Sequence, residues 1–287
     1  MKHKIITFGE LMLRLSPDNN ERFTQAHSYE AVYGGGEANT AVSLANFNVD
    51  TRYVTKLPKH TIGQSAVNSL RQYGVDVSRI VRGGDQIGIY FLEKKTSQRP
   101  TNVIYNRNGS AFALAAKEDF DWDSIFDGAT WFHFSGITPA ISDNMAEITI
   151  EACKEAKKRG ITVSCDLNYR SKLWSSEKAN KVMSEVCRYV DICIANEDDA
   201  VGIFGMDASK SDKEKNAYIA EELTKMFPNF KMVASVWRTE TSITTFKLQS
   251  MIYTEGKAYY SQEFFMNILD YIGAGDAYCA GIKSTVL

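Results

Sequence analysis

Two hydrophobic patterns alternate along most of the chain. Short apolar runs rich in β-branched and aromatic residues predict strands, and these runs are 4–11, 51–57, 129–136, 160–168, 190–197 and 231–237. Longer runs with a helical pattern separate most of them, and these are 36–47, 62–74, 142–159, 176–189 and 214–227. This alternation predicts a mostly parallel sheet with helices on both faces, which is the α/β class.

The pattern also predicts how two of the helices pack and end. One face of the helix 62–74 is expected to be buried, and it carries Ile62, Ala66, Leu70 and Tyr73. Gly74 is expected to stop that helix. Gly160 is expected to end the helix 142–159 in the left-handed conformation.

Two segments, 12–33 and 87–108, do not follow the alternation. Both are polar and strand-like, and the second has two apolar runs joined by a turn that contains Pro100. They predict a small accessory sheet, and the alternative is a pair of surface hairpins.

Composition narrows the class of protein without choosing a function. Net charge is −2 in 287 residues, so no general attraction to nucleic acid or to an anionic membrane is expected. No apolar run reaches the roughly 18 residues of a membrane-spanning helix. The five cysteines are odd in number and lack C-x-x-C spacing, which is typical of reduced core residues in a cytoplasmic protein.

The most informative motif is the turn 270–281. Gly273, Ala274 and Gly275 precede Asp276, where a helical pattern begins. Backbone N–H groups at such a turn form an anion cradle that suits a phosphate. Asp276 would accept the proton of an attacking hydroxyl there. The alternative is an ordinary strand-to-helix turn with an acidic cap.

A second glycine turn, at residues 33–39, also precedes a helix. Gly35 and Gly36 allow a ligand to approach the backbone, and Asn39 is suited to hydrogen-bond a sugar hydroxyl. The spacing does not match the dinucleotide motif G-x-G-x-x-G. A flexible connection is the alternative.

Two further loops follow predicted strands, at the edge where α/β sheets bind their ligands. Arg170 is suited to grip a carboxylate or phosphate with two hydrogen bonds, and an exposed surface pair is the alternative. The polar residues 196–199 either position Mg²⁺ through water or cap the next helix. We interpret Asp198 as a cap and Asn196 as functional.

Taken together, these motifs resemble the ribokinase-like (PfkB) family of sugar kinases. The resemblance covers nearly the whole chain, and the matching signature residues are Gly35, Gly36, Asn39, Asp270, Gly273, Ala274, Gly275, Asp276 and Gly281. It implies a ribokinase-like core of residues 1–11, 34–86 and 109–287, with a β lid formed by 12–33 and 87–108. It further implies ATP and Mg²⁺ as cofactors and a homo-oligomer that assembles through the lid.

Within that family, the segments 88–93, 103–111, 135–144 and 168–176 are similar to kinases of the sugar acid 2-keto-3-deoxygluconate. The resemblance implies a substrate site that contains Gly35, Gly36, Asn39, Tyr90, Tyr105, Arg107, Arg170 and Asp276. It gives Asp276 the role of catalytic base. It implies that ATP contacts Asn168, Arg170, Asn196, Gly273, Ala274 and Gly275, and that Asp199 positions the metal through water. Arg107 would favour a sugar acid over a neutral sugar because the acid carries a carboxylate.

Some features depart from the family pattern. The glutamate of its N-x-x-E motif is replaced by Asp199, and the small residues before the glycine turn are replaced by Tyr271 and Ile272. The chain ends at Leu287, so we expect an incomplete adenine pocket, weak ATP binding and slow turnover. The alternatives are a kinase of fructose, ribose or a nucleoside, and a sugar-binding protein without turnover.

Overall fold

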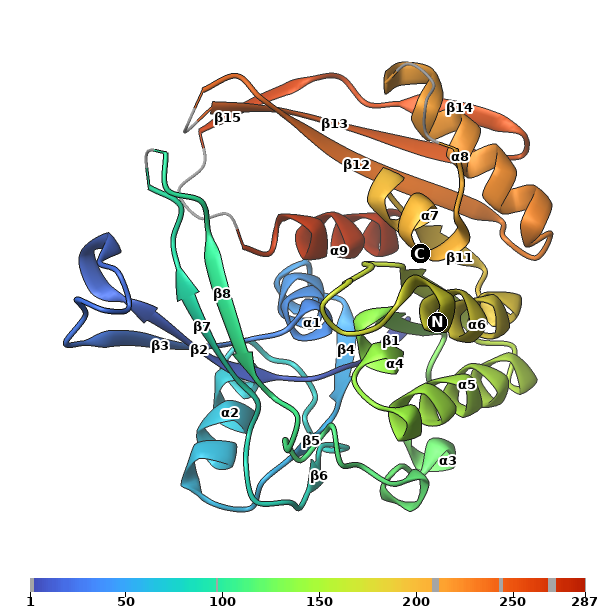
Figure 1. The fold of residues 1–287 in the computed structure, drawn as a ribbon. Coiled ribbons are helices and arrows are strands. Elements are labelled where there is room, and N and C mark those ends of the chain that lie inside the picture. Colours follow the sequence, from blue (N-terminus) through green and yellow to red (C-terminus); the bar gives the residue numbers. More distant parts are fainter. Residues whose placement is uncertain (1–2, 97, 208–211, 243–244, 268–271, 287) are drawn as a thin grey trace.

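The large sheet forms the centre of the molecule (Figure 1). A computed structural model describes residues 3–96, 98–207, 212–242, 245–267 and 272–286. Within these residues the sheet has the strand order β14-β13-β12-β11-β10-β9-β1-β4, and β15 pairs with β13. The strands are β1 (Lys4–Phe8), β4 (Asp50–Val54), β9 (Trp131–Ser135), β10 (Thr162–Asp166), β11 (Ile192–Ile194), β12 (Met232–Glu240), β13 (Thr245–Thr254), β14 (Lys257–Tyr260) and β15 (Phe264–Asn267).

Six strands of the large sheet run parallel, and these are β4, β1, β9, β10, β11 and β12. β13 runs antiparallel to β12, β14 and β15. All six predicted strands are present, although the segment 51–57 divides into β4 and the short β5 (Lys56–Leu57), which pairs with β6 (Val81–Arg82). The hairpin strands β13 to β15 were not predicted. Their residues are mostly half-buried or exposed, so their apolar pattern is weak.

Helices cover both faces of the large sheet, which confirms the predicted α/β class (Figure 1). The helices are α1 (Gly36–Asn46), α2 (Thr61–Arg71), α3 (Trp122–Ile125), α4 (Ile137–Ala140), α5 (Asp143–Lys158), α6 (Ser176–Val186), α7 (Glu197–Phe204), α8 (Asp212–Met226) and α9 (Ala274–Val286), with short 3-10 turns η1 (Asp18–Asn20), η2 (Lys117–Asp119) and η3 (Cys187–Tyr189). Residues of α5 to α8 share one apolar cluster with Phe132. Leu44 of α1 and Ala280 of α9 pack on the opposite face with Ile5.

The buried face of α2 differs from the predicted one. Ile62 and Tyr73 are 43% and 49% exposed, whereas Ala66 and Leu70 are buried. The helix begins at Thr61 and ends at Arg71, so Tyr73 lies beyond its last turn. The buried face is therefore Gly63, Ala66, Val67 and Leu70, which follows helical spacing more closely. The prediction for Gly160 was correct, because it follows the C-cap of α5 with positive φ, whereas α2 ends at Arg71, three residues before Gly74.

A second sheet lies beside the first, at the left of Figure 1. Its four strands are ordered β3 (Tyr29–Gly34), β2 (Met12–Pro17), β7 (Ile89–Glu93) and β8 (Asn102–Asn106). We call it the small sheet. The parallel pairing of β2 with β7 joins the two segments that interrupt the alternation. They therefore form one accessory sheet and not two separate surface hairpins.

The cysteines belong to the core, as predicted. All five are buried and none is in a disulfide. Burial raises the pKa of the Cys153, Cys165 and Cys193 thiols, which lowers their reactivity. Among the described residues, no helix is long and apolar enough to cross a membrane.

Candidate active site

Asp276 lies where two glycine-led helices meet. It is the third residue of α9, and it lies three positions after Gly273, whose φ of 86° favours glycine. Asn39 of α1 donates a hydrogen bond from Nδ2 to Asp276 Oδ2 at 2.7 Å, and Thr40 Oγ1 bonds to the main-chain oxygen of Asp276. A Cβ at Gly36 would lie 3.5 Å from Asp276 Oδ1. The two motifs that were predicted separately thus form one site.

The environment of Asp276 suits a general base. Burial is the main effect that raises its pKa, to about 6, and the charge of Glu37 raises it further. The hydrogen bond from Asn39 and the charges of Arg170 and Lys283 oppose this rise. A carboxyl group with this pKa is mostly ionised at neutral pH and holds a proton better than an exposed aspartate does.

The start of α9 is accessible to an anion. Ala274 and Gly275 are exposed, and the first intrahelical bond there is from Ala277 N to the oxygen of Gly273. The N–H groups of the first helical turn have no partner within a helix, and the helix dipole adds positive potential. This end of α9 therefore has the features of the predicted phosphate cradle. Asp270 and Tyr271 of the same motif lie outside the described residues.

A cavity of about 600 Å³ lies between the small sheet and the loop after β10. We call it the arginine cavity, because Arg107 and Arg170 both line it, together with Gly35, Gly36, Glu37 and Tyr105. Arg107 follows β8 of the small sheet, and Arg170 follows β10 of the large sheet. The cavity therefore brings together the two arginines that were predicted to act on one substrate.

Arg107 is held by Glu10, and Glu10 is held in turn by the Ser110 hydroxyl; neither contact was predicted. Its Nε donates to Glu10 Oε2 at 2.7 Å, its Nη2 donates to the same oxygen, and Ser110 Oγ donates to Glu10 Oε1. Burial raises the pKa of Glu10, whereas Arg107 and Ser110 oppose the rise. In the sequence, Glu10 is an acid that follows an apolar strand, which alone does not indicate burial.

Glu37 is another buried acid at this cavity. Its Oε1 accepts hydrogen bonds from Ser135 N at 2.8 Å, Ser135 Oγ at 2.6 Å and Thr138 Oγ1 at 3.1 Å. These bonds tie the first turn of α1 to the end of β9. An acid in the first helical turn is common, so the sequence carried no particular signal for this role.

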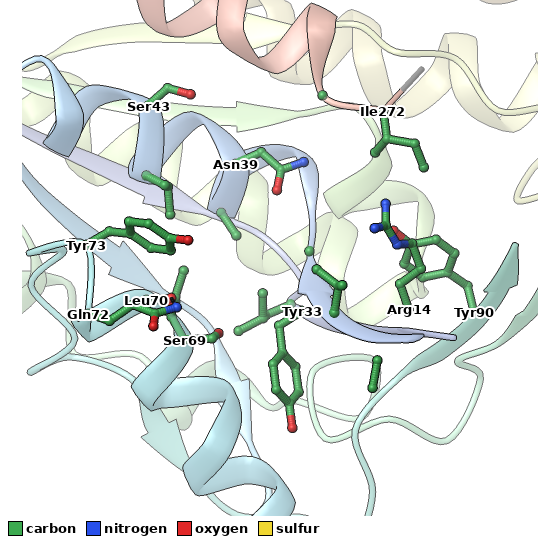
Figure 2. Close-up of a pocket in the computed structure, with 17 residues that line it drawn as sticks. Arg14, Tyr33, Asn39, Ser43, Ser69, Leu70, Gln72, Tyr73, Tyr90 and Ile272 are labelled. Atoms are coloured by element: carbon green, nitrogen blue, oxygen red, sulfur yellow. Dashed lines mark hydrogen bonds between the residues drawn. The ribbon is translucent and has the colours of Figure 1, made fainter. Parts of the chain in front are cut away.

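Figure 2 shows a second cavity, of about 520 Å³. Gly34 lines it, whereas Gly35 and Gly36 line the arginine cavity. Asn39, Gly273 and Tyr90 line this second cavity and not the arginine cavity. The Tyr90 and Tyr105 rings are 5.9 Å apart on paired strands, so Tyr90 lies at the border of the two cavities. Ile272 lines the second cavity and is partly exposed.

The loop after β10 carries Asn168 and Arg170. Asn168 has a φ of 39°, and its Nδ2 lies 3.5 Å from Asp166 Oδ2. Arg170 is exposed, and its charge opposes the rise that burial causes in the pKa values of Asp166, Asp199 and Asp276. Arg170 therefore lies within electrostatic reach of both the glycine turn and the acids around it.

Asn196 and Asp199 form a capping box at the start of α7. Asn196 Oδ1 accepts from Asp199 N, and Asp199 Oδ2 accepts from Asn196 N, both at 3.0 Å. The interpretation of Asp198 as the cap was wrong, because Asn196 precedes the helix and Asp198 is exposed within it. Asp199 Oδ1 also accepts from Tyr169 N at 2.6 Å, which fixes the loop that carries Arg170.

Asp166, at the end of β10, was not predicted as a site residue. Burial is the first cause that raises its pKa to about 8, and the charges of Asp199 and Asp276 add to it. Burial likewise raises the pKa of Asp199 to about 6. We call Asp166, Asp199 and Asp276 the carboxylate cluster. The sequence did offer a signal for Asp166, because it begins the segment "DLN" at a strand end, where polar residues lie at the ligand-binding edge of the sheet.

Lys283 is a fully buried cation beneath this cluster. Its Nζ donates to the Cys279 oxygen at 2.8 Å, and burial lowers its pKa while Asp166 and Asp276 oppose that shift. Asp276, Cys279 and Lys283 follow one another at helical spacing on α9. That spacing was visible in the sequence, but lysine is rarely buried, so the position was not recognised.

Comparison with known proteins agrees with this geometry. The family model for pfkB family carbohydrate kinases matches residues 2–287. A 2-dehydro-3-deoxygalactonokinase of Haloferax volcanii is 33% identical over 290 residues, covering 100% of this chain and 85% of its own. A 5-dehydro-2-deoxygluconokinase of Clostridium perfringens is 27% identical over 291 residues, covering 100% and 81%. The crystal structure of a 2-dehydro-3-deoxygluconokinase from Thermotoga maritima aligns with a TM-score of 0.95 and 44% identity, covering 100% of this chain and 87% of that one.

The family model and the relatives extend over the whole chain, and the two glycine motifs that carried the resemblance meet at Asp276. The chain belongs to the pfkB family of carbohydrate kinases.

Proposed function

We propose that the protein transfers the γ-phosphoryl group of ATP to a terminal hydroxyl of 2-keto-3-deoxygluconate, also called 2-dehydro-3-deoxygluconate. The observation that carries this proposal is the arginine cavity. Arg107 and Arg170 reach it from two different sheets, and its Gly36 wall adjoins Asp276 Oδ1. A substrate with a carboxylate at one end and a hydroxyl at the other matches this arrangement.

In the proposed reaction, Asp276 acts as the base and the start of α9 binds the transferring phosphoryl group. Asp276 Oδ1 accepts the hydroxyl proton while the hydroxyl oxygen forms a bond to the γ-phosphorus. The bond between that phosphorus and the bridging oxygen of ADP breaks, and ADP leaves with the electron pair. N–H groups of Ala274 and Gly275 hold the charge of the transferring group, and Asn39 keeps Asp276 oriented.

The acids around the glycine turn fit a divalent cation that is held through water. Burial raises the pKa values of Asp166, Asp199 and Asp276, and the charges of Asp199 and Asp276 add to the rise at Asp166, so a nearby cation would favour the ionised forms. Among the described residues, no group of three acidic, histidine or cysteine side chains is arranged to hold a metal ion. Asp199 and Asp166 would hold the waters of Mg²⁺, and the bound ion supplies charge neutralisation at the phosphates. Asn168, Asn196 and Arg170 would contact ATP beside it.

A substrate panel tests the proposal. Phosphorylation is measured with ATP and 2-dehydro-3-deoxygluconate, its galactonate epimer, 5-dehydro-2-deoxygluconate, fructose, ribose and a nucleoside. The 2-dehydro-3-deoxy acids are expected to have the highest kcat/KM. A preference for fructose, ribose or the nucleoside would overturn the sugar-acid assignment but keep a kinase.

Binding measurements separate a kinase from a sugar-binding protein without turnover. ATP and the sugar acid are titrated separately by calorimetry. Sugar-acid binding without any ATP binding would support the binding protein. Binding of both with turnover supports the kinase.

We also propose that the small sheet acts as a lid and joins copies of the chain in the cytoplasm. Tyr29 and Ile104 leave apolar surface exposed on its outer side, and a second copy would cover it. Light scattering of the wild type and of Ile104→Asp tests this. A monomer at all concentrations for the wild type would contradict it.

A further inference from the structure

Four chain crossings connect the small sheet to the rest of the protein, and one residue contacts all of them. The crossings are the links β1–β2, β3–α1, the segment before β7 and the segment after β8. Glu10 lies in the first link. A Cβ at Gly35, in the second link, would overlap the main-chain oxygen of Glu10. A Cβ at Gly88, in the third, would lie 2.6 Å from Glu10 Oε1, and Arg107 bonds to Glu10 from the fourth.

The Glu10–Arg107 pair is buried and fully oriented. Glu10 and Arg107 are 4% and 6% exposed. Each carboxylate oxygen of Glu10 has a donor, because Arg107 bonds to Oε2 and Ser110 bonds to Oε1. Ser110 Oγ is itself fixed by accepting from Ala113 N at 3.1 Å. A buried pair of this kind permits one orientation of the guanidinium group.

Arg107 lines the arginine cavity, and Glu10 binds only one edge of its guanidinium group. Glu10 accepts hydrogen bonds from Nε and Nη2, and Nη1 has no hydrogen-bond partner among the described residues. The guanidinium carbon of Arg107 lies 5.8 Å from the centre of the Tyr105 ring, which also lines the cavity. One planar group thus has one edge bound by protein and another available to an anion.

We propose that Glu10 is a positioning residue for recognition of the substrate carboxylate. It holds Arg107 so that Nη1 faces the arginine cavity, and it does so from the junction where the small sheet joins the large one. This inference rests on the proposed function, in which Arg107 contacts the carboxylate of a sugar acid. Glu10 itself is not expected to touch the substrate.

Calorimetric titration of variants with 2-keto-3-deoxygluconate and with its neutral amide tests the inference. Glu10→Gln is expected to weaken binding of the acid about tenfold and binding of the amide much less, because a misplaced guanidinium loses a charge-assisted bond. In turnover assays KM for the acid rises while kcat and KM for ATP stay within about threefold, since Asp276 and the cradle are unchanged.

Gly88→Ala provides a second variant if Glu10→Gln folds poorly. The added methyl group would crowd Glu10 Oε1 without altering any charge. The same selective loss for the acid is expected. Glu93→Gln is the matched control, because Glu93 is also buried in the small sheet but bonds to Phe23 N and Asn102 Nδ2 and not to Arg107. It should leave both ligands unaffected.

A double-mutant cycle with Arg107→Lys decides how Glu10 acts. If it acts through the guanidinium group, Glu10→Gln has little further effect on acid binding in the Arg107→Lys background. Additive losses, or equal losses for acid and amide, would overturn the inference. If Arg107→Lys itself spares acid binding, or the wild type does not bind the acid, the proposed function fails first and the inference fails with it.

Discussion

Two charged regions of the molecule differ in how their charges are balanced. In the Glu10–Arg107 pair, every charged oxygen has a donor and the partners are buried together. In the carboxylate cluster, the charge of the exposed Arg170 acts on all three acids, and the charge of the buried Lys283 acts on Asp166 and Asp276. Burial raises the pKa values in both regions, but Arg107 and Ser110 oppose the rise at Glu10, whereas the charges of Asp199 and Asp276 add to the rise at Asp166.

The difference indicates which half of the site is complete without ligands. The pair at the arginine cavity is already compensated, so it can position a group before the substrate arrives. In the carboxylate cluster, burial and the charges of Asp199 and Asp276 raise the pKa of Asp166 to about 8, so the ligand-free protein holds a proton on that acid at neutral pH. A cation beside these acids would favour release of that proton.

The largest expected effect comes from removing the base. Asp276→Asn keeps the shape of the side chain and removes its proton affinity, so kcat is expected to fall by about 10²–10⁴-fold. Sugar binding measured by calorimetry should change little. Asp198→Asn is the control, because Asp198 is an exposed acid nearby on α7. If kcat of the Asp276→Asn variant stayed within about twofold of the wild-type value, Asp276 would be excluded as the base.

Breaking the compensated pair should cost stability more than any single change in the carboxylate cluster. Arg107→Ala leaves Glu10 buried without its cation, and the free energy of unfolding in urea is expected to fall by about 3–5 kcal/mol. The double variant Glu10→Leu with Arg107→Met should recover much of this loss, because it removes both charges. If the single and double variants were equally unstable, the loss would come from packing and not from charge.

In the carboxylate cluster, the stability of the folded protein should depend on pH through the proton held by Asp166. The folded-state pKa of Asp166 is raised from 3.8 to about 8, so the folded protein binds this proton more tightly than the unfolded chain does. Its contribution to stability is therefore fully present below about pH 4 and is lost as the pH rises through about 8.

Asp166→Asn removes that dependence. At about pH 9 the variant is expected to raise Tm by about 2–6 °C, and at about pH 5 the change should be smaller. Differential scanning calorimetry of both proteins across this range measures it. A variant that is less stable than wild type at high pH would show that the Asp166 carboxylate is compensated after all.

The smallest expected effect is a difference in thiol-labelling rate between Cys279, beside the carboxylate cluster, and Cys153, in another apolar cluster. Cys279 Sγ lies 3.8 Å from Asp166 Oδ2, so its exposure follows local opening of α9 at the cluster. Saturating Mg²⁺ with ATP is expected to slow its labelling by at least about threefold. Labelled peptides are identified by mass spectrometry, and Cys153, in the opposite apolar cluster, serves as the internal control. Equal slowing at both cysteines would indicate global stabilisation instead.

Local motifs were predictable from the sequence, and the effects of burial were not. The glycine turn before Asp276 and the small sheet followed from residue types at short spacing. Glu10, Glu37 and Asp166 were missed because their importance depends on neighbours about 100 positions away in the chain, which only the fold brings together. The face of α2 was misjudged because its start was placed one residue too late and its end three residues too late.

The pairing of β2 with β7 has a consequence for how the chain is made. The first hairpin of the small sheet, β2 and β3, leaves the ribosome long before residue 89, where β7 begins. Throughout that interval one edge of β2 has unpaired N–H and C=O groups, which is the kind of surface that promotes mispairing between nascent chains. The completion of the small sheet must also wait for α1, β4 and α2 to bring β7 back to β2, so its contacts are of long range and form slowly. Translation speed across residues 35–88 should therefore influence the yield of native protein more than speed in the parallel core that follows.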